Sequence, residues 1–249
     1  MVFDCFTFCS EFELLEISVK ELEPLNPTHV LVQANKTFTN KLKPIYNLGD
    51  DFPSVLCVNV EDMPEGGDPW TREKHQRNSI MRGLSQLKVD DNDFVIIRDI
   101  DEIPSCEAIK KYKPEMGTTA LVMDKMGYWL NCREGKQSWK IAKILTYGKL
   151  KQSTPDLIRN SGQDSEIPNA GFHFSWLGDS DRLIKKLESF SHTECNTPKL
   201  NNKETLRYKR ATGQSLWGED FWEFVKIDES FPAEIRNNQQ KYKHLIREL

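Results

Sequence analysis

Short apolar runs alternate with amphipathic segments in the first half of the chain. Four runs rich in β-branched and aromatic residues predict buried strands, at residues 2–8, 29–32, 55–60 and 94–97. Apolar residues at helical spacing follow Ser10 and Asp68. Ser10 and Glu13 have the spacing of a capping box, and Pro69 stands at the first position of the second helix. Strands that alternate with helices predict an α/β fold, with a mostly parallel central sheet covered by helices.

The pattern in the second half is less regular. Strands are predicted at residues 120–123, 126–130 and 171–176, and helices at 181–190 and 203–209. Residues 139–147 fit either a strand or a helix. Residues 153–169 are rich in Ser, Pro, Asn and Asp and predict a loop. No flexible linker divides the chain, so we expect one domain over residues 1–249.

Composition and charge exclude several classes of protein. The 249 residues carry a net charge of -4, which argues against a nucleic-acid partner, because such binding needs clustered Lys and Arg. The apolar runs are too short to span a membrane, and the N-terminus has no signal-peptide pattern. None of the six cysteines forms a C-x-x-C pair, and several lie in apolar runs. We therefore expect buried, reduced thiols and a protein that works in the cytoplasm.

Carboxylates are concentrated just after the strand predicted at 94–97. Asp99, Asp101 and Glu102 follow it directly, beside Arg98. Ligands of open α/β sheets bind beyond the carboxyl ends of the strands. In extended backbone Asp99 and Asp101 would point the same way, which suits a divalent cation that also binds diphosphate oxygens. The acids could instead form a solvated turn before a helix, and Arg98 could pair with either a carboxylate or a phosphate.

Other candidate residues stand further from this segment. His173, on the strand predicted at 171–176, is either a third metal ligand or a structural histidine. Trp176 could stack on a sugar ring or belong to the core. Arg77 and Asn78 could reach a uracil, ribose or phosphate, or lie on a solvated face where Arg77 pairs with Glu73.

A pair of acids bracketed by aromatic residues suggests a general base. Glu219 and Asp220 stand between Trp217 and Phe221. Aromatic neighbours that exclude water would raise the proton affinity of a carboxylate and make it a competent base. The same residues could also open an amphipathic helix, where acids suit the helix dipole.

Taken together, the ordered motifs resemble glycosyltransferase family 17, the family of β-1,4-mannosyl-glycoprotein β-1,4-N-acetylglucosaminyltransferase. The similar segments are residues 3–8, 11–16, 36–39, 43–44, 76–78, 99–104 and 171–176. The resemblance implies a GT-A-like fold, a UDP-N-acetylglucosamine donor, a Mn²⁺ or Mg²⁺ ion, a glycan acceptor and inversion at the anomeric carbon. The organisation of the single domain further predicts a nucleotide-sugar half at residues 1–115 and an acceptor-shaping half at residues 116–249.

The resemblance assigns Asp99, Asp101 and the strand at residues 3–6, and the chemistry of the other candidates suggests the remaining roles. Asp99 and Asp101 correspond to the D-x-D pair that holds the metal ion, with His173 as a third ligand. The expected donor-binding residues are Phe3, Asp4, Phe6, Arg77, Asn78, Arg98 and Asp99. Glu102 and Trp176 are expected to contact the acceptor, and Asp220 or Glu219 to act as the base.

Two alternatives remain open from the sequence. One is a carbohydrate-binding or inactive pseudo-transferase domain. The other is a metal-dependent phosphodiesterase, which would be expected to have a more basic surface and more metal-binding histidines than the five present here. Animal members of the family have an N-terminal membrane helix, and no such helix is evident here. We therefore expect a bacterial cell or a virus-infected host cell as the location.

Overall fold

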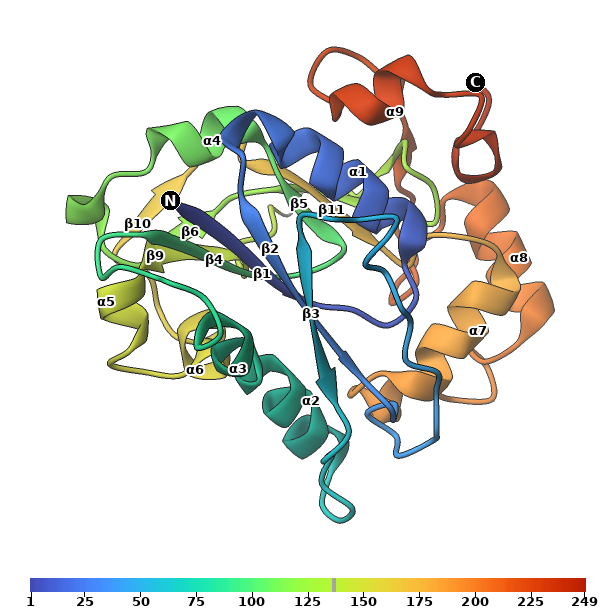
Figure 1. Ribbon diagram of the computed structural model, residues 1–249. Coiled ribbons are helices and arrows are strands. Elements are labelled where there is room, and N and C mark those ends of the chain that lie inside the picture. Colours follow the sequence, from blue (N-terminus) through green and yellow to red (C-terminus); the bar gives the residue numbers. More distant parts are fainter. Residues whose placement is uncertain (136–137) are drawn as a thin grey trace.

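The computed structural model describes residues 1–135 and 138–249. It contains two β-sheets, and the larger one has helices on both faces (Figure 1). The α/β class predicted from the sequence is confirmed.

The larger sheet has seven strands in the order β10-β6-β9-β4-β1-β2-β3. They are β1 (Val2–Thr7), β2 (Thr28–Ala34), β3 (Val55–Val60), β4 (Phe94–Asp99), β6 (Thr119–Leu121), β9 (Lys143–Thr146) and β10 (Ser165–Ile167). Strands β1 to β4 pair in parallel, as do β6 and β10. Strand β9 runs antiparallel to both β4 and β6. The sheet is therefore mixed, because β9, in the segment that the sequence left open between strand and helix, interrupts the parallel arrangement.

The smaller sheet was not expected from the sequence. Its order is β12-β8-β7-β11-β5, formed by β5 (Glu102–Pro104), β7 (Asp124–Gly127), β8 (Cys132–Arg133), β11 (Gly171–Ser175) and β12 (Glu223–Phe224). Gly171 opens β11 at a φ of 127°, and a Cβ atom there would lie 2.1 Å from the Ile103 carbonyl oxygen. Only glycine allows this close approach of β11 to β5. Strands from both sides of residue 115 enter each sheet, so the two sequence halves do not correspond to the two sheets.

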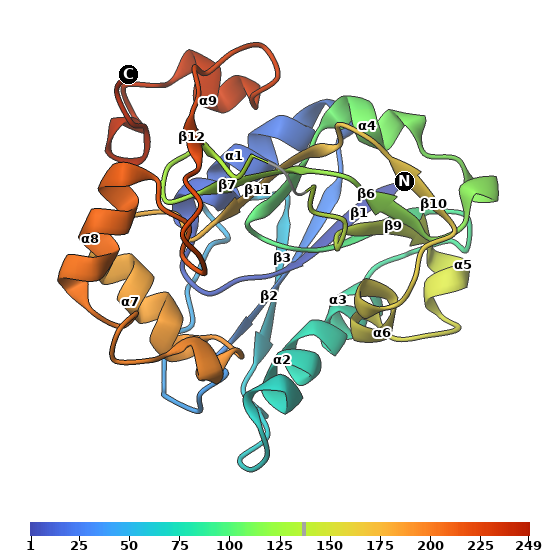
Figure 2. The same cartoon turned by 180° about the vertical axis from the view of Figure 1, so that it is seen from behind.

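The helices are α1 (Phe12–Leu22), α2 (Pro69–Asn78), α3 (Ile80–Leu84), α4 (Cys106–Lys111), α5 (Tyr147–Leu150), α6 (Pro155–Asn160), α7 (Ser180–Ser189), α8 (Lys203–Thr212) and α9 (Ala233–Asn237). Short 3₁₀ helices are η1 (Glu23–Leu25), η2 (Pro114–Met116), η3 (Thr193–Cys195) and η4 (Lys243–Leu245). Helices α1 and α2–α3 lie on opposite faces of the larger sheet, and α7 and α8 lie beside it, as both views show (Figures 1 and 2). In the described part of the chain, no helix combines the length and the apolar character that a membrane span requires.

The core follows the alternation of side chains along the strands. Phe3 and Cys5 of β1 pack with Ile80 of α3 on one face, whereas Phe6 packs with Leu15 of α1 on the other. Because successive side chains of a strand point to opposite faces, one apolar strand can serve both layers. The helices predicted near 181–190 and 203–209 are confirmed as α7 and α8.

Two local predictions are wrong. Helix α1 has Glu11, not Ser10, at its N-cap, and the Glu11 carboxylate accepts the backbone N–H groups of Cys9 and Ser10. The segment 153–169 is not a loop, because it contains α6 and β10. Thr154 caps α6 by accepting the N–H of Leu157, and a proline occupies the first helical position.

Candidate active site

The two acids of the D-x-D motif lie where the chain leaves the larger sheet and enters the smaller one. Asp99 is the last residue of β4, and Glu102 is the first residue of β5. Ile100 and Asp101 form the turn between them. The motif therefore stands at the carboxyl end of a parallel strand, which is where open α/β sheets bind ligands.

Asp99 is surrounded by donors from three other elements. Its carboxylate accepts hydrogen bonds from Thr7 of β1 at 2.8 Å, Arg159 of α6 at 2.6 Å and Arg77 of α2 at 3.3 Å. Thr7 is its register partner across the parallel β1–β4 pair. Burial raises the pKa of Asp99, but Arg159 and Arg77 outweigh this effect, so the pKa lies below its usual value. Asp99 is held as a carboxylate.

Asp101 contacts a different pair of residues. The ammonium group of Lys186, on α7, lies 3.0 Å from Oδ2, and Nε2 of His173, on β11, lies 3.6 Å from Oδ1. Burial raises the pKa of Asp101, yet Lys186 and His173 together hold it well below the usual range. Burial also opposes the charge of Lys186, but Asp101 raises the pKa of this ammonium group above its usual value.

The expectation that Asp99 and Asp101 point the same way assumed extended backbone, and this assumption is wrong. The strand ends at Asp99, and Asp101 lies in a turn. The two carboxylates have different partners, yet they remain close enough for Asp101 to raise the pKa of Asp99. They form neighbouring parts of one charged cluster.

Glu102 is fully buried, and its carboxylate accepts hydrogen bonds that hold several residues of this cluster in place. Arg159 donates to both of its carboxylate oxygens, at 2.6 and 2.7 Å, and the backbone N–H of Asp99 donates to Oε2 at 2.8 Å. The indole N–H of Trp139 donates to Oε1, and the Trp139 ring stacks on His173 with 4.2 Å between centroids. Glu102 was expected to touch the acceptor, but here it has no exposed surface and instead orients three neighbours.

Arg77 and Asn78 connect α2 with this cluster. Arg77 is buried, and it donates to Glu73 at 2.7 Å, to Asp156 at 2.8 Å and to Asp99. The Glu73–Arg77 ion pair considered from the sequence is present. Asn78 accepts the backbone N–H of Asp156 at 3.0 Å and so anchors α6 against α2.

Four of the expected donor-binding residues are internal. Arg98 is fully buried and donates to both oxygens of the buried Asp4, at 2.6 and 2.7 Å, while His29 lies 2.8 Å from Asp4. Phe3 and Phe6 are 2% and 0% exposed. These side chains have no surface open to a ligand in this structure, so they act here in the core beneath the site.

Trp176 also lies inside, directly after β11. It packs edge-on against Phe190 and Trp217, and the ammonium group of Lys186 lies 5.3 Å from its ring centroid. Trp176 is 6% exposed, whereas Trp217 is 52% exposed. Of these two indoles, Trp217 therefore offers the more open surface to a sugar ring.

The aromatic enclosure expected around Glu219 and Asp220 is not formed. Both acids are exposed in a loop that the Ser215 N–H closes by donating to the Asp220 carbonyl at 2.7 Å. Phe221 is 62% exposed and does not exclude water. The prediction that these acids are buried among aromatic residues is therefore wrong for this structure, as is the alternative that they open a helix.

A comparison with protein families gives this site its chemical context. The family model described as Glycosyltransferase family 17 matches residues 1–246. The chain belongs to glycosyltransferase family 17. It is thus a glycosyltransferase, and its substrates are a sugar donor and an acceptor. A search of curated proteins gave no match.

Three residues of this family 17 glycosyltransferase were not among the predicted site residues. They are Arg159, which joins Asp99 to Glu102, Lys186, which binds Asp101, and Trp139, which supports His173. Thr154 followed by Pro155 has the sequence signal of a helix N-terminus and could have revealed α6. Lys186 stands 85 positions from its partner, and no local pattern connects the two.

The charges of the family 17 site leave room for a cation. Five carboxylates form ion pairs with three cations; the carboxylates are Glu73, Asp99, Asp101, Glu102 and Asp156, and the cations are Arg77, Arg159 and Lys186. The buried Lys143 also interacts electrostatically with Glu102, so the cluster carries one net negative charge. Asp101 and His173 are the pair best placed to bind an ion together, because their facing atoms are 3.6 Å apart. Asp99, with both oxygens bound by arginines, is less available.

The expected set of three metal ligands is not assembled. In residues 1–135 and 138–249, one group of three His, Cys, Asp or Glu residues has all its ligand atoms within 4.8 Å of one another, and it consists of His192, Glu194 and Cys195. Asp99, Asp101 and His173 do not form such a group. Of the three predicted ligands, only Asp101 and His173 lie within a few ångströms of each other among the described residues, so a divalent ion here would need substrate oxygens and water to complete its coordination.

Proposed function

We propose that this family 17 enzyme transfers N-acetylglucosamine from UDP-N-acetylglucosamine to a hydroxyl group of a glycan, with inversion at the anomeric carbon. The proposal includes a GT-A-like fold and a Mn²⁺ or Mg²⁺ ion. The observation that carries it is the position of Asp101, in the turn after β4, between Lys186 and His173. An acid, an imidazole and an ammonium group thus meet at the edge of the sheet where a nucleotide sugar is expected.

Asp101 and His173 would hold the divalent ion, which supplies charge that stabilises the diphosphate as a leaving group. The net negative charge of the cluster supports this assignment. Lys186 is placed to contribute a further positive charge beside the same diphosphate. Trp139 keeps the His173 ring in position by stacking on it.

Asp99 has a separate function in the proposal. Arg77 and Arg159 neutralise its charge and fix its direction at the end of β4. When the donor binds, these guanidinium groups could release Asp99 and bind phosphate oxygens of the donor instead. Arginine can bind a carboxylate and a phosphate through the same pair of parallel hydrogen bonds. A cavity of about 230 Å³ is lined by Glu73 and Asp156, the other two carboxylates that bind Arg77.

The general base of the proposal is Asp220, with Glu219 as the alternative. Their loop is connected to the metal site through packed side chains, since Trp217 contacts Trp176 and Trp176 lies beside Lys186. Closure of the loop over bound substrates would bring a carboxylate toward the acceptor hydroxyl and exclude water. We also propose a cytoplasmic location, which six free cysteines support.

A thermal-shift experiment tests the proposal. UDP-N-acetylglucosamine should raise the Tm in the presence of Mn²⁺ but not after chelation with EDTA, because ligands that bind only the folded state stabilise it. UDP-glucose measures donor selectivity, and free N-acetylglucosamine without metal is the control for a lectin-like binder. Stabilisation by the free sugar alone would contradict the proposal and favour a carbohydrate-binding domain.

A further inference from the structure

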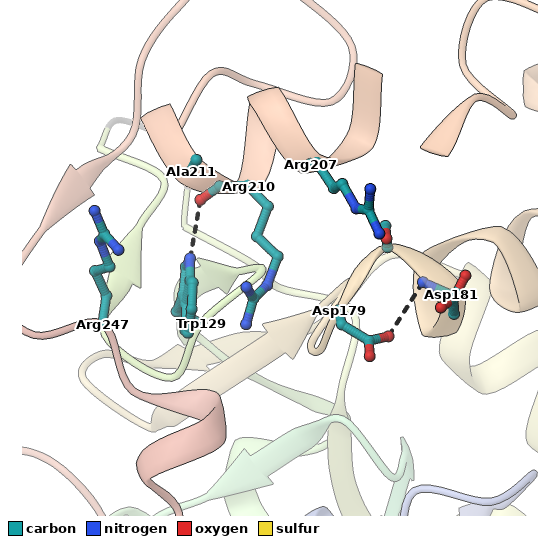
Figure 3. A pocket seen from close by; sticks show the side chains of 8 residues that line it. Trp129, Asp179, Asp181, Arg207, Arg210, Ala211 and Arg247 are labelled. Atoms are coloured by element: carbon teal, nitrogen blue, oxygen red, sulfur yellow. Dashed lines mark hydrogen bonds between the residues drawn. The ribbon is translucent and has the colours of Figure 1, made fainter. Parts of the chain in front are cut away.

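A second cavity, of about 280 Å³, is formed between the N-terminal end of α7, helix α8 and the C-terminal segment (Figure 3). Its walls carry the side chains of Trp129, Asp179, Asp181, Arg207, Arg210 and Arg247. Arg207 and Arg210 come from α8, and Arg247 comes from the end of the chain. Three guanidinium groups, from two segments of the chain, therefore line the same cavity.

Arg210, on the wall of this cavity, is held by contacts on several sides. Its guanidinium group lies 3.3 Å from the ring centroid of Trp129, and its Nε donates to the Gly178 carbonyl at 2.7 Å. The indole N–H of Trp129 donates in turn to the Arg210 carbonyl at 2.9 Å. A guanidinium group that is already ordered loses little further entropy when it binds a ligand.

The two acids of the cavity are engaged elsewhere. Asp179 caps α7 by accepting the backbone N–H groups of Asp181 and Arg182, and Asp181 forms an ion pair with Lys203 at 2.6 Å. Within the described residues, no ion pair is formed by the side chains of Arg207, Arg210 or Arg247. The cavity therefore has three arginines and two acids on its walls, and Asp179 also lies within electrostatic range of Arg210. One positive charge remains in excess at this surface, in a protein with a net charge of -4.

We propose that this cavity binds an acidic group of the acceptor, a carboxylate or phosphate carried by a sugar residue remote from the reacting hydroxyl. Guanidinium groups suit such oxyanions because they donate two parallel hydrogen bonds. Helix α7 links the cavity to the active site: Asp179 precedes the helix, and Lys186, seven positions later, contacts Asp101. At 1.5 Å per residue this is roughly 10 Å along the helix, which a short oligosaccharide can span.

Placing the acceptor in the cavity rests on the proposed function, whereas binding of an anion there does not. Binding energy from such a remote group would be available to orient the acceptor for transfer. The test therefore measures binding with EDTA present and without donor, so that its result is independent of the metal site.

The probes are glucuronic acid, glucose 6-phosphate, inorganic phosphate and glucose, each titrated in a thermal-shift assay at constant ionic strength. The Arg207→Gln/Arg247→Gln variant removes two exposed arginines of the cavity. The matched control is Lys20→Gln/Lys110→Gln, which removes two exposed positive charges on α1 and α4. Circular dichroism and the Tm without ligand verify that both variants fold.

The acidic sugars should raise the Tm of the wild type and of the control, and glucose should not. The arginine variant should bind the acidic sugars at least about tenfold more weakly, because it loses charge-assisted hydrogen bonds. Equal binding by the arginine variant and the control would overturn the proposal. Inorganic phosphate that binds as well as the acidic sugars would overturn the assignment to an acceptor sugar, and would show a site for free anions.

Discussion

Nε2 of His173 lies 3.6 Å from Oδ1 of Asp101, although 72 residues separate them in the sequence. Strand β11 pairs with β5, in which Glu102 is the register partner of His173. This pairing holds the imidazole beside the turn that carries the second acid of the D-x-D motif. The smaller sheet thus completes a site that begins in the larger one.

Lys186 should oppose metal binding and favour transfer. Its ammonium group occupies one oxygen of Asp101, so Lys186→Met removes a competing cation from the metal ligand. We expect Mn²⁺ to bind about tenfold more tightly to this variant, a difference of about 1.4 kcal/mol, and turnover to fall at least tenfold because the diphosphate loses a positive charge. Isothermal titration with Mn²⁺ and steady-state kinetics measure the two effects.

The neighbouring Lys185, which is exposed, provides the control for Lys186. Lys185→Met should change neither Mn²⁺ affinity nor turnover by more than about twofold. Weaker Mn²⁺ binding by Lys186→Met would contradict the competition that we infer.

Arg159 should be essential for stability as well as for the site. Arg159→Met leaves the buried Glu102 without its bidentate partner, so we expect a loss of about 3–5 kcal/mol in the free energy of unfolding. Arg82→Met breaks an exposed pair with Asp62 and should cost no more than about 1 kcal/mol. Urea unfolding of both variants measures the difference, and equal losses would show that the buried network does not have this role.

The proposed base should affect turnover far more than donor binding. Asp220→Asn should lower kcat by roughly 10²–10⁴-fold, because the acceptor hydroxyl loses its proton acceptor, and should leave donor affinity within about twofold. Glu219→Gln, one residue away in the same exposed loop, is the matched variant. If kcat falls only in Glu219→Gln, Glu219 is the base, and if neither variant loses activity the base lies outside this loop.

Acid should destabilise the fold because the pKa of the buried Asp4 carboxyl is lowered in the folded protein. Burial opposes the ionisation of Asp4, but Arg98 and His29 hold its pKa well below the usual value of about 4. At pH 2–4 the unfolded chain therefore binds a proton at Asp4 that the folded protein does not, so stability is present above that range and is lost as the pH falls. This one group contributes a slope of up to about 1.4 kcal/mol per pH unit.

Urea unfolding between pH 3 and pH 7 measures this slope. Asp4→Asn should be less stable at pH 7, because Arg98 keeps no anionic partner, and its stability should depend less steeply on pH below 4. If Asp4→Asn unfolds with the same dependence of stability on pH as the wild type, the pKa of Asp4 is not lowered in the folded protein. Asp91→Asn, which removes an exposed surface acid, controls for net charge.

The sequence predicted the strands of the first half because each is long and apolar enough to show its pattern. Strand β3 has the predicted bounds, and β4 extends the predicted strand by two residues, to Asp99. The smaller sheet was missed because strands such as β8 and β12 have two residues each, too few for an alternation to be recognised.

The candidate site was predictable only in part, for a similar reason. Asp99, Asp101 and His173 were identified from local sequence, and they lie around one turn. The cations that bind the two acids come from α2, α6 and α7, and long-range ion pairs leave no periodic signal. Arg98 was expected to contact the donor, whereas the carboxylate with which it pairs is Asp4, 94 positions away in the core.

If Asp101 couples a divalent ion to a sugar nucleotide, the Asp101→Asn variant should lose the metal-dependent stabilisation by donor. The measurement is the Tm with UDP-N-acetylglucosamine at 100 times its Kd, with and without Mn²⁺. The wild type should gain about 2.7 kcal/mol, or roughly 5–10 °C, only when Mn²⁺ is present, and Asp101→Asn should gain nothing. A variant that folds and shows the same Mn²⁺-dependent shift as the wild type would contradict the account.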